Sequence, residues 1–315
     1  MARRDLRLGL IGAGPWGRTY INAIAAIDGL KLTRLASRNP QSRSLVDPAC
    51  RISEDWRQVA EALDVDGVII ATPPNLHAEM AIAALTFGRP VLVEKPLTMD
   101  LAQAVELRRH VDLYDGLVMV DHTHLFHPAF RALKELSRAL GPLKAIQTDA
   151  GNQGPYRKNT PVIWDWGAHD VAMCLDLIGG VPEKVRAERL ASEMIDGGRG
   201  ENLFIGLSFA GGVEAEIRIG NMMEKKRRLK ACFADATLVY DGLADEPLMI
   251  YPPTDDIDAP LGPGEPIETA RDLPLDIVLK EFATAIVNAD SGPESLDLAV
   301  AVTGVLAECE KALPQ

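Results

Sequence analysis

Aliphatic runs and amphipathic stretches alternate along the first part of the chain. Residues 15–28, 75–87 and 100–114 repeat their apolar positions at helical spacing. Between them lie short runs rich in Val, Ile and Leu, at residues 8–11, 32–36, 67–72, 91–93 and 117–120. Such strands separated by helices are typical of a parallel sheet that is covered on both faces. The pattern predicts a doubly wound α/β domain over residues 1–122.

The pattern changes after residue 122. A helix is expected at 128–140, and short strands follow, several of them joined by glycine turns such as 210–212 that suit antiparallel hairpins. One helix interrupts them at 164–178, and two helices at 276–288 and 296–313 close the chain. Residues 245–272 hold six prolines and many acids, which predicts an irregular surface segment. Residues 123–315 are therefore expected to form an α+β domain.

Composition narrows the function classes. The 315 residues suggest two domains, and 47% hydrophobic and 25% charged residues are ordinary for globular proteins. A net charge of −12 argues against nucleic acid or an anionic membrane as a partner. The cysteines are few and far apart, so a disulfide framework is not expected. With no signal peptide or membrane span in the sequence, we expect a soluble, cytoplasmic protein.

A glycine fingerprint joins the first predicted strand to the first predicted helix. The motif G-x-G-x-x-G alone is a weak signal, but this position in a βαβ unit is the one that its mechanism requires. The first glycine permits the tight turn, the second lets a pyrophosphate approach, and the third allows close helix–strand packing. The helix N-terminus then offers its N–H groups to the phosphates. The predicted dinucleotide contacts are Gly12, Gly14, Pro15, Trp16 and Gly17.

The end of the second predicted strand bears on the choice between NAD and NADP. An acid there would bind the ribose 2′-hydroxyl of NAD, but this chain has Ser37 followed by Arg38. A guanidinium forms charge-assisted hydrogen bonds to a 2′-phosphate. The sequence therefore favours NADP over NAD, with the alternative that Arg38 is an ordinary solvated arginine.

Three further motifs make a resemblance specific. Ala-Thr-Pro-Pro-Asn-Leu-His follows the third strand, Glu-Lys-Pro follows the fourth, and Trp-Asp-Trp-Gly-Ala-His-Asp opens a helix of the second domain. With the glycine fingerprint, and in this order, they resemble the Gfo/Idh/MocA oxidoreductases, the family of glucose–fructose oxidoreductase and inositol dehydrogenase. The resemblance covers essentially the whole chain. It implies a Rossmann domain, a second domain with a large, open, mainly antiparallel sheet, and a homodimer or homotetramer built through that sheet.

The resemblance also implies roles for individual residues. Lys95 corresponds to the active-site lysine, and Asp165 and His169 correspond to the Asp-x-x-x-His pair of the inositol dehydrogenase branch. Many relatives carry an aspartate where this chain has Ala172, so the polar support of the histidine is expected to differ. The residues expected beside the cofactor are Thr72, Pro73, Asn75, His77, Glu94 and Lys95.

The same chemistry follows from the residues themselves. Lys95 ends a parallel strand, where its ammonium could stabilise developing alkoxide charge on a substrate. Asp165 and His169 are four residues apart, so on one helix they would share a face, and the carboxylate would orient the imidazole as a general base. Each group alone could be a surface residue, and only their combination with the fingerprint favours catalysis.

Other polar groups carry weaker signals. Residues 122–127 contain three histidines, for which we expect hydrogen-bonded structural roles rather than a metal site, although His124 could face the substrate. Asn152 and Tyr156, on an expected loop, are candidate substrate contacts. The basic run 225–228 could meet a phosphorylated substrate, but a solvated strand face is the simpler interpretation.

These observations predict an NAD(P)-dependent oxidoreductase that acts on a hydroxyl or carbonyl of a sugar, cyclitol or nucleotide-sugar-like substrate. Two alternatives stay open. One is a relative with different chemistry, such as a glycosidase that uses NAD in a transient oxidation. The other is a dinucleotide-sensing regulator without catalysis.

Overall fold

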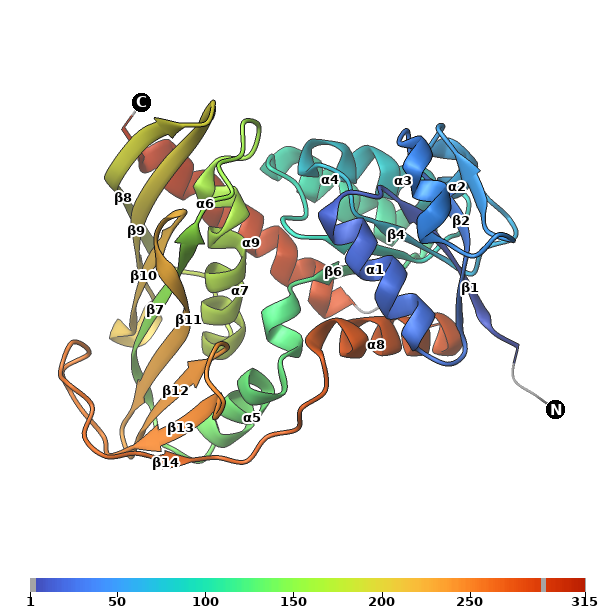
Figure 1. The fold of residues 1–315 in the computed structure, drawn as a ribbon. Helices are drawn as coiled ribbons and strands as arrows, with labels where there is room; N and C mark the ends of the chain where they lie inside the picture. The colour runs from blue at the N-terminus through green and yellow to red at the C-terminus, as the bar shows by residue number, and fades with distance from the viewer. Residues whose placement is uncertain (1–3, 290–292, 315) are drawn as a thin grey trace. The chain divides into compact units, whose positions relative to one another are not determined.

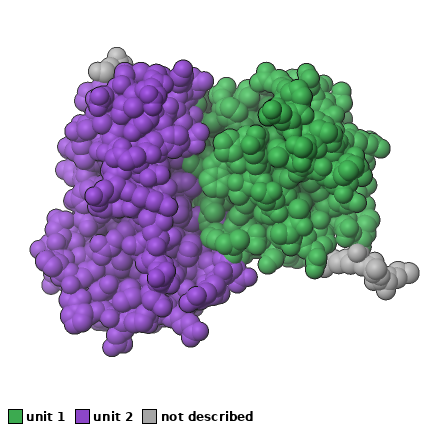
Figure 2. Space-filling model, viewed as in Figure 1, with its two compact units in different colours: residues 1–123, 273–303 green, residues 124–272, 304–315 purple. Residues whose placement is uncertain are grey.

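The computed structural model describes residues 4–289 and 293–314. The ends of the predicted domains at residues 1–3 and 315 lie outside this range. The chain forms two compact units (Figure 2). The first comprises residues 1–123 and 273–303, and the second comprises residues 124–272 and 304–315. The first unit thus ends next to the predicted boundary, but it also takes in residues 273–303, which the sequence pattern assigns to the second domain.

A six-stranded sheet in the order β3-β2-β1-β4-β5-β6 forms the centre of the first unit (Figure 1). Every strand pair in it is parallel, as the uninterrupted apolar runs predict. The chain reverses its direction of winding between β1 and β4, and the carboxyl edge at such a point is where α/β sheets bind ligands. The strands are β1 (Leu6–Ile11), β2 (Leu30–Ala36), β3 (Arg51–Ser53), β4 (Gly67–Ile70), β5 (Val91–Glu94) and β6 (Val118–Asp121).

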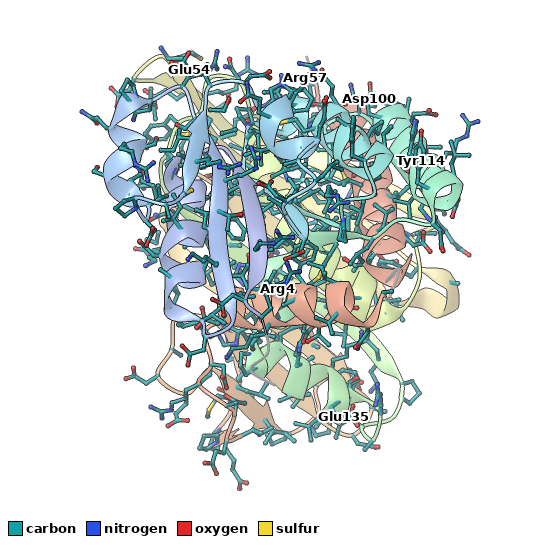
Figure 3. The ribbon with its side chains drawn as sticks, turned by 90° about the vertical axis from the view of Figure 1, so that its right-hand side faces the viewer. Arg4, Glu54, Arg57, Asp100, Tyr114 and Glu135 are labelled. Carbon is teal, nitrogen blue, oxygen red and sulfur yellow. The ribbon has the colours of Figure 1, made fainter. Side chains whose placement is uncertain are left out.

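Helices cover this sheet, and their ends follow local sequence signals. Asp100, labelled in Figure 3, caps α4 by accepting hydrogen bonds from the amides of Ala102 and Gln103. Gly29 and Gly88 follow helices with φ of +84° and +66°, a left-handed conformation that glycine adopts readily after a helix end. The helices of this unit are α1 (Pro15–Ala26), α2 (Arg57–Ala60), α3 (His77–Thr86), α4 (Leu101–Tyr114) and α8 (Pro274–Asn288).

The core of the first unit lies between the sheet and these helices. Val68, Ile69 and Ile70 of β4 are fully buried, and so are Ala81 and Ala84 of α3. At about 25 cal/mol per Å² of apolar area removed from water, such strands supply much of the driving force for folding. The small side chains on α3 let it pack closely, so the turns at the strand ends rest on a rigid layer.

An eight-stranded sheet in the order β14-β13-β12-β11-β7-β10-β9-β8 dominates the second unit. Among the described strands of this sheet, only β7 and β10 pair in parallel, so the expected large and mainly antiparallel sheet is confirmed. Its strands are β7 (Leu143–Gln153), β8 (Lys184–Ile195), β9 (Gly198–Ser208), β10 (Glu214–Gly220), β11 (Met222–Phe233), β12 (Thr237–Asp241), β13 (Leu248–Tyr251) and β14 (Glu265–Pro266).

Helices of the second unit pack on one face of this sheet (Figure 1). They are α5 (Pro128–Ser137), α6 (Val162–Asp165) and α7 (Gly167–Ile178), while α9 (Pro293–Ala312) contributes residues to both units. Within the described residues, 4–289 and 293–314, no helix combines the length and the apolar character needed to cross a bilayer.

The single helix expected at 164–178 is wrong, because the structure divides it at Trp166. At the end of α6, the amide of Trp166 donates a hydrogen bond to the carbonyl of Val162, four residues earlier. The amide of His169 then donates to the carbonyl of Trp166, only three residues earlier. A shift from four-residue to three-residue bonding breaks the regular helical spacing. Trp166 itself keeps right-handed helical dihedrals, so Asp165 and His169 lie on two successive helical segments.

Candidate functional site

The glycine turn after β1 is both crowded and open. A Cβ on Gly12, whose φ is +102°, would lie 2.5 Å from the carbonyl oxygen of Ala71, and one on Gly17 would lie 2.1 Å from the carbonyl oxygen of Gly12. A Cβ on Gly14 would meet no heavy atom of the described chain within 4 Å. Gly12 and Gly17 are thus required by the packing of the turn, whereas Gly14 leaves space for a ligand.

Helix α1 begins at this turn with its amides directed to the open space. Gly14 is the N-cap and offers no side chain to the first-turn amides, and Pro15 occupies the first helical position. Trp16 follows with 39% of its surface exposed. An uncapped helix N-terminus carries partial positive charge and suits a phosphate. The turn therefore fits the pyrophosphate of a dinucleotide.

Gly17→Ala and Gly14→Ala separate the two roles of this turn. Because its Cβ would overlap the carbonyl of Gly12, Gly17→Ala is expected to lower the free energy of unfolding by about 1–3 kcal/mol. Gly14→Ala should change it by less than about 1 kcal/mol but weaken dinucleotide binding roughly tenfold. Urea unfolding and fluorescence titration with NADPH measure the two effects. Equal stability losses in both variants would contradict this description.

The turn after β2 presents Arg38 but not Ser37. The Ser37 hydroxyl is 2.8 Å from the Ser42 hydroxyl and accepts a hydrogen bond from the amide of Asn39 at 3.2 Å. Arg38 is exposed at the carboxyl end of the strand. Ser37 thus stabilises the turn itself, and Arg38 is the residue that could bind a 2′-phosphate.

His77 connects two turns at the carboxyl edge of the sheet. It is fully buried, with Nε2 2.8 Å from the carbonyl oxygen of Thr72 and Nδ1 3.0 Å from that of Pro96. Burial lowers the pKa of His77 and so favours the neutral ring, which donates to one of these carbonyls at a time. The structure therefore places His77 between the turn after β4 and the turn after β5, where it sets their spacing.

The turn after β4 differs from the predicted helix start. Asn75 is not the N-cap of α3, because Pro74–Leu76 forms a 3₁₀ turn and the helix begins at His77. Pro73 and Asn75 are exposed, and Thr72 is half-buried. These three residues remain accessible beside the glycine turn.

Lys95 follows β5 as a half-buried residue among titratable neighbours. Burial, and to a smaller extent the charge of Lys95, lowers the pKa of His122 to about 3. The same charge acts on the Glu94 and Asp121 carboxyls, in the direction that favours their ionised forms. Glu94 is only 5% exposed. Lys95 is therefore the accessible cation at this strand end, above a layer of buried acids and histidines.

In the second unit, His169 lies in an aromatic cluster. Its ring centroid is 4.7 Å from that of His124, in an edge-to-face arrangement. His124 Nδ1 is 3.2 Å from the hydroxyl of Tyr240, which also packs against His127 at 5.0 Å between centroids. The structure thus brings His124, a candidate substrate contact, next to His169. The sequence did not indicate Tyr240 as a site residue. The alternation of side chains along a strand shows only which face of the sheet a residue occupies.

A small cavity adjoins this cluster. Its volume is about 10 Å³, room for about one water molecule, and its lining includes His169, Asp170 and Tyr240. The guanidinium of Arg227 stacks 4.2 Å from the centre of the Trp166 ring beside it. Burial raises the pKa of Asp170 to about 7, and neither of its carboxyl oxygens has a hydrogen-bond partner among the described residues. This cluster of the second unit combines imidazoles, a phenol and a buried carboxyl.

Asp165 has a partner that the sequence did not predict. Arg157 donates a hydrogen bond to its carboxylate at 2.6 Å, and Asp165 is only 16% exposed. Asn152, expected on a loop, is in strand β7, and Tyr156 follows in the segment after it. The Tyr156 hydroxyl donates to Gln153 at 3.3 Å. An Arg157–Asp165 pair therefore holds the end of α6, directly before the segment α7 that carries His169.

The other histidines have structural surroundings. His127 accepts a hydrogen bond from the amide of Ala129 as the N-cap of α5. His122 is fully buried, but neither of its ring nitrogens has a hydrogen-bond partner among the described residues, so the expected hydrogen-bonded role is wrong for this residue. Across residues 4–289 and 293–314, no group of three or more His, Cys, Asp or Glu side chains has the arrangement of a metal site. The basic run 225–228 lies in β11, where Arg227 contacts Trp166 and the other three residues are exposed.

Sequence comparisons relate this chain to known dehydrogenases. Residues 6–122 match the model of an oxidoreductase family with an NAD-binding Rossmann fold. The chain is 30% identical over 180 residues to 4-carboxy-2-hydroxymuconate-6-semialdehyde dehydrogenase of Sphingobium sp. (strain NBRC 103272 / SYK-6), a match that covers 53% of this chain and 57% of that protein. It is 34% identical over 145 residues to inositol 2-dehydrogenase 4 of Saccharopolyspora erythraea, a match that covers 44% of this chain and 43% of that protein. The matches thus span about half the length of these curated relatives.

A comparison of structures extends the similarity to the whole chain. A crystal structure from Magnetospirillum magnetotacticum MS-1, assigned as an oxidoreductase without a named substrate, is 44% identical. The TM-score is 0.92, and the match covers 97% of this chain and 99% of that one.

Proposed function

Because the chain belongs to the Gfo/Idh/MocA oxidoreductases, with their NAD-binding Rossmann fold, we propose a specific reaction for it. The protein transfers a hydride between a nicotinamide dinucleotide, preferably NADP, and a CH–OH or carbonyl group of a sugar, cyclitol or related polyol. A cytoplasmic location and a homo-oligomer built through the second unit's sheet belong to the same proposal.

One arrangement in the first unit carries the proposal. Adjacent parallel strands β1, β4 and β5 end at one edge of the sheet, and these ends bear the open glycine turn, the Thr72–Pro73 turn and Lys95. A dinucleotide-binding turn and an accessible ammonium group therefore share one edge. A regulator that only senses dinucleotides would have no need of the ammonium.

Each unit is assigned one part of the reaction. A bound nicotinamide would supply the hydride acceptor or donor. Lys95 holds the substrate oxygen and stabilises the negative charge that develops on it. His169, supported by His124 and by Asp165 with its partner Arg157, takes the hydroxyl proton, and returns it when the reaction runs toward reduction.

A substrate screen tests the proposal. The purified protein is incubated with NADP⁺ or NAD⁺ and a panel of polyols, cyclitols and nucleotide sugars, and formation of the reduced nicotinamide is followed by its absorbance. Net reduction with at least one polyol is expected. Tight dinucleotide binding without turnover on any member would instead support a sensor. Glycoside cleavage without net reduction would support the transient-oxidation chemistry.

Arg38→Ala tests the cofactor preference. Arg38 is exposed at the end of β2, where it could bind the 2′-phosphate. We expect the Kd of NADPH to rise roughly 10- to 100-fold, because the substitution removes one or two charge-assisted hydrogen bonds. The Kd of NADH should change less than about twofold, because NADH has no 2′-phosphate. The control is Arg57→Ala, an exposed arginine of the same unit paired with Glu79. An unchanged Kd of NADPH in Arg38→Ala refutes the preference.

A further inference from the structure

Two carboxyl groups and a phenol are buried together below the strand end that carries Lys95. Glu94 of β5 and Asp121 of β6 are register partners in the parallel sheet. Tyr20, from helix α1, donates a hydrogen bond from its hydroxyl to Asp121 Oδ2 at 2.5 Å. Asp121 and Tyr20 are fully buried, and Glu94 is 5% exposed. None of these three side chains has a part in the reaction proposed above.

The hydrogen bonds indicate where the cluster holds its charge. Asp121 also accepts a hydrogen bond from the hydroxyl of Thr123 at 2.8 Å, so both of its oxygens are stabilised as acceptors. Glu94 Oε1, in contrast, has no hydrogen-bond partner among the described residues. Burial, together with the nearby charge of Asp121, raises the pKa of Glu94 to about 8. Burial raises the pKa of Asp121 as well, but the hydroxyls of Tyr20 and Thr123 both donate to its carboxylate and oppose that shift. These hydrogen bonds favour the negative charge of the pair on Asp121 and its proton on Glu94.

The other titratable groups around the pair leave Lys95 as its only cationic counterpart among the described residues. Burial lowers the pKa values of His122 and His77, so both imidazoles are neutral at neutral pH. Burial raises the pKa of Tyr20 well above its ordinary value, so the phenol keeps its proton. The Lys95 charge acts on both carboxyls of the pair. The charge of Lys95 therefore stabilises the negative charge of the pair.

We propose that Asp121 is a positioning residue for Lys95, and that the proton on Glu94 limits the buried pair to the single negative charge that balances this ammonium. The inference rests on the proposed function only in assigning Lys95 to the substrate oxygen. With neither acid ionised, the ammonium would lose its fixed counter-charge. With both ionised, the excess negative charge would oppose alkoxide formation on the substrate.

Two isosteric substitutions separate the roles of the two acids. Asp121→Asn removes the charge but leaves an oxygen that can accept from Tyr20, and we expect it to lower kcat roughly tenfold or more, with little change in the Kd of NADPH. Glu94→Gln replaces one neutral group by another, so its loss of kcat should be smaller. Asp112→Asn, which neutralises an exposed acid of α4, is the matched control. Thermal unfolding checks that each variant is folded.

Infrared spectroscopy of the protein without cofactor locates the proton directly. The wild-type minus Glu94→Gln difference spectrum should contain the carbonyl stretch of a protonated carboxyl, which disappears as the pH is raised through about 8. In Asp121→Asn the same band should titrate at lower pH, because the neighbouring charge has gone. Asp170 is present in both proteins, so any carbonyl stretch of its carboxyl cancels in the difference spectrum.

The outcomes distinguish this inference from the proposed function. A band that Glu94→Gln does not remove, or a larger loss of kcat in Glu94→Gln than in Asp121→Asn, overturns the assignment of proton and charge. Wild-type kcat in Asp121→Asn overturns its positioning role. If the wild type transfers no hydride to any substrate, the proposed function fails, and the infrared result alone decides whether the pair holds one proton.

Discussion

Lys95→Met is expected to lower kcat by roughly 10²- to 10³-fold, the usual cost of removing one group that stabilises an oxyanion. Methionine keeps the length and apolar character of the side chain but has no ammonium to hold the substrate oxygen. Because the open space for the pyrophosphate is at Gly14, the Kd of the dinucleotide should change much less than kcat. Rapid-mixing measurement of nicotinamide reduction, beside a fluorescence titration, provides both values.

Lys31→Met is the matched control for this change. Lys31 is an exposed lysine of β2 in the same unit, so its substitution should leave kcat within about twofold of the wild-type value. A comparable loss of kcat in both variants would show that the loss comes from the change in the overall charge of the protein. Normal kcat in Lys95→Met would remove Lys95 from the reaction.

His169→Asn is expected to lower kcat by roughly 10²- to 10⁴-fold, the range typical of a lost general base. Asparagine can still form hydrogen bonds, but it cannot take a proton at neutral pH. Rapid-mixing measurement of nicotinamide reduction at neutral pH gives the kcat of this variant. His110→Asn, on helix α4 of the other unit, is the control and should keep the wild-type kcat.

The double variant of Lys95 and His169 tests whether the two residues serve one reaction. If they act on the same transition state, the two increases in activation free energy should be far from additive. The kcat of the double variant should then be little lower than that of the less active single variant. Losses that multiply fully would indicate independent effects, and would contradict the assignment of both residues to one hydride transfer.

Much of the fold was predictable because its main elements carry periodic patterns. The strands β1, β4 and β5 contain the apolar runs 8–11, 67–70 and 91–93, and α4 covers residues 101–114 of the helix expected at 100–114. Strand β3 and helix α2 were missed, since three or four residues cannot establish a period. The assignment of residues 273–303 to the first unit depends on tertiary packing, such as that of Phe282 near Gly67, which a one-dimensional pattern does not contain.

The candidate site was predictable where chemistry and motif coincide in a few consecutive residues. Gly12, Gly17 and Lys95 belong to such motifs, and the structure gives the two glycines the contacts that require them. Tyr240 and Tyr20 could not be found in this way, because they reach His124 and Asp121 from 116 and 101 residues away. The break at Trp166 was hidden as well, since both flanking segments have helical composition.

Single-turnover reduction of NADP⁺ by the wild type and by Lys95→Met, with the same polyol, tests the central claim most directly. We expect the wild type to form reduced nicotinamide in the presence of at least one polyol. Lys95→Met should bind the dinucleotide with a similar Kd and reduce it at least roughly 10²-fold more slowly. Equal rates in the two proteins, or tight binding without reduction across the whole panel, would contradict the account.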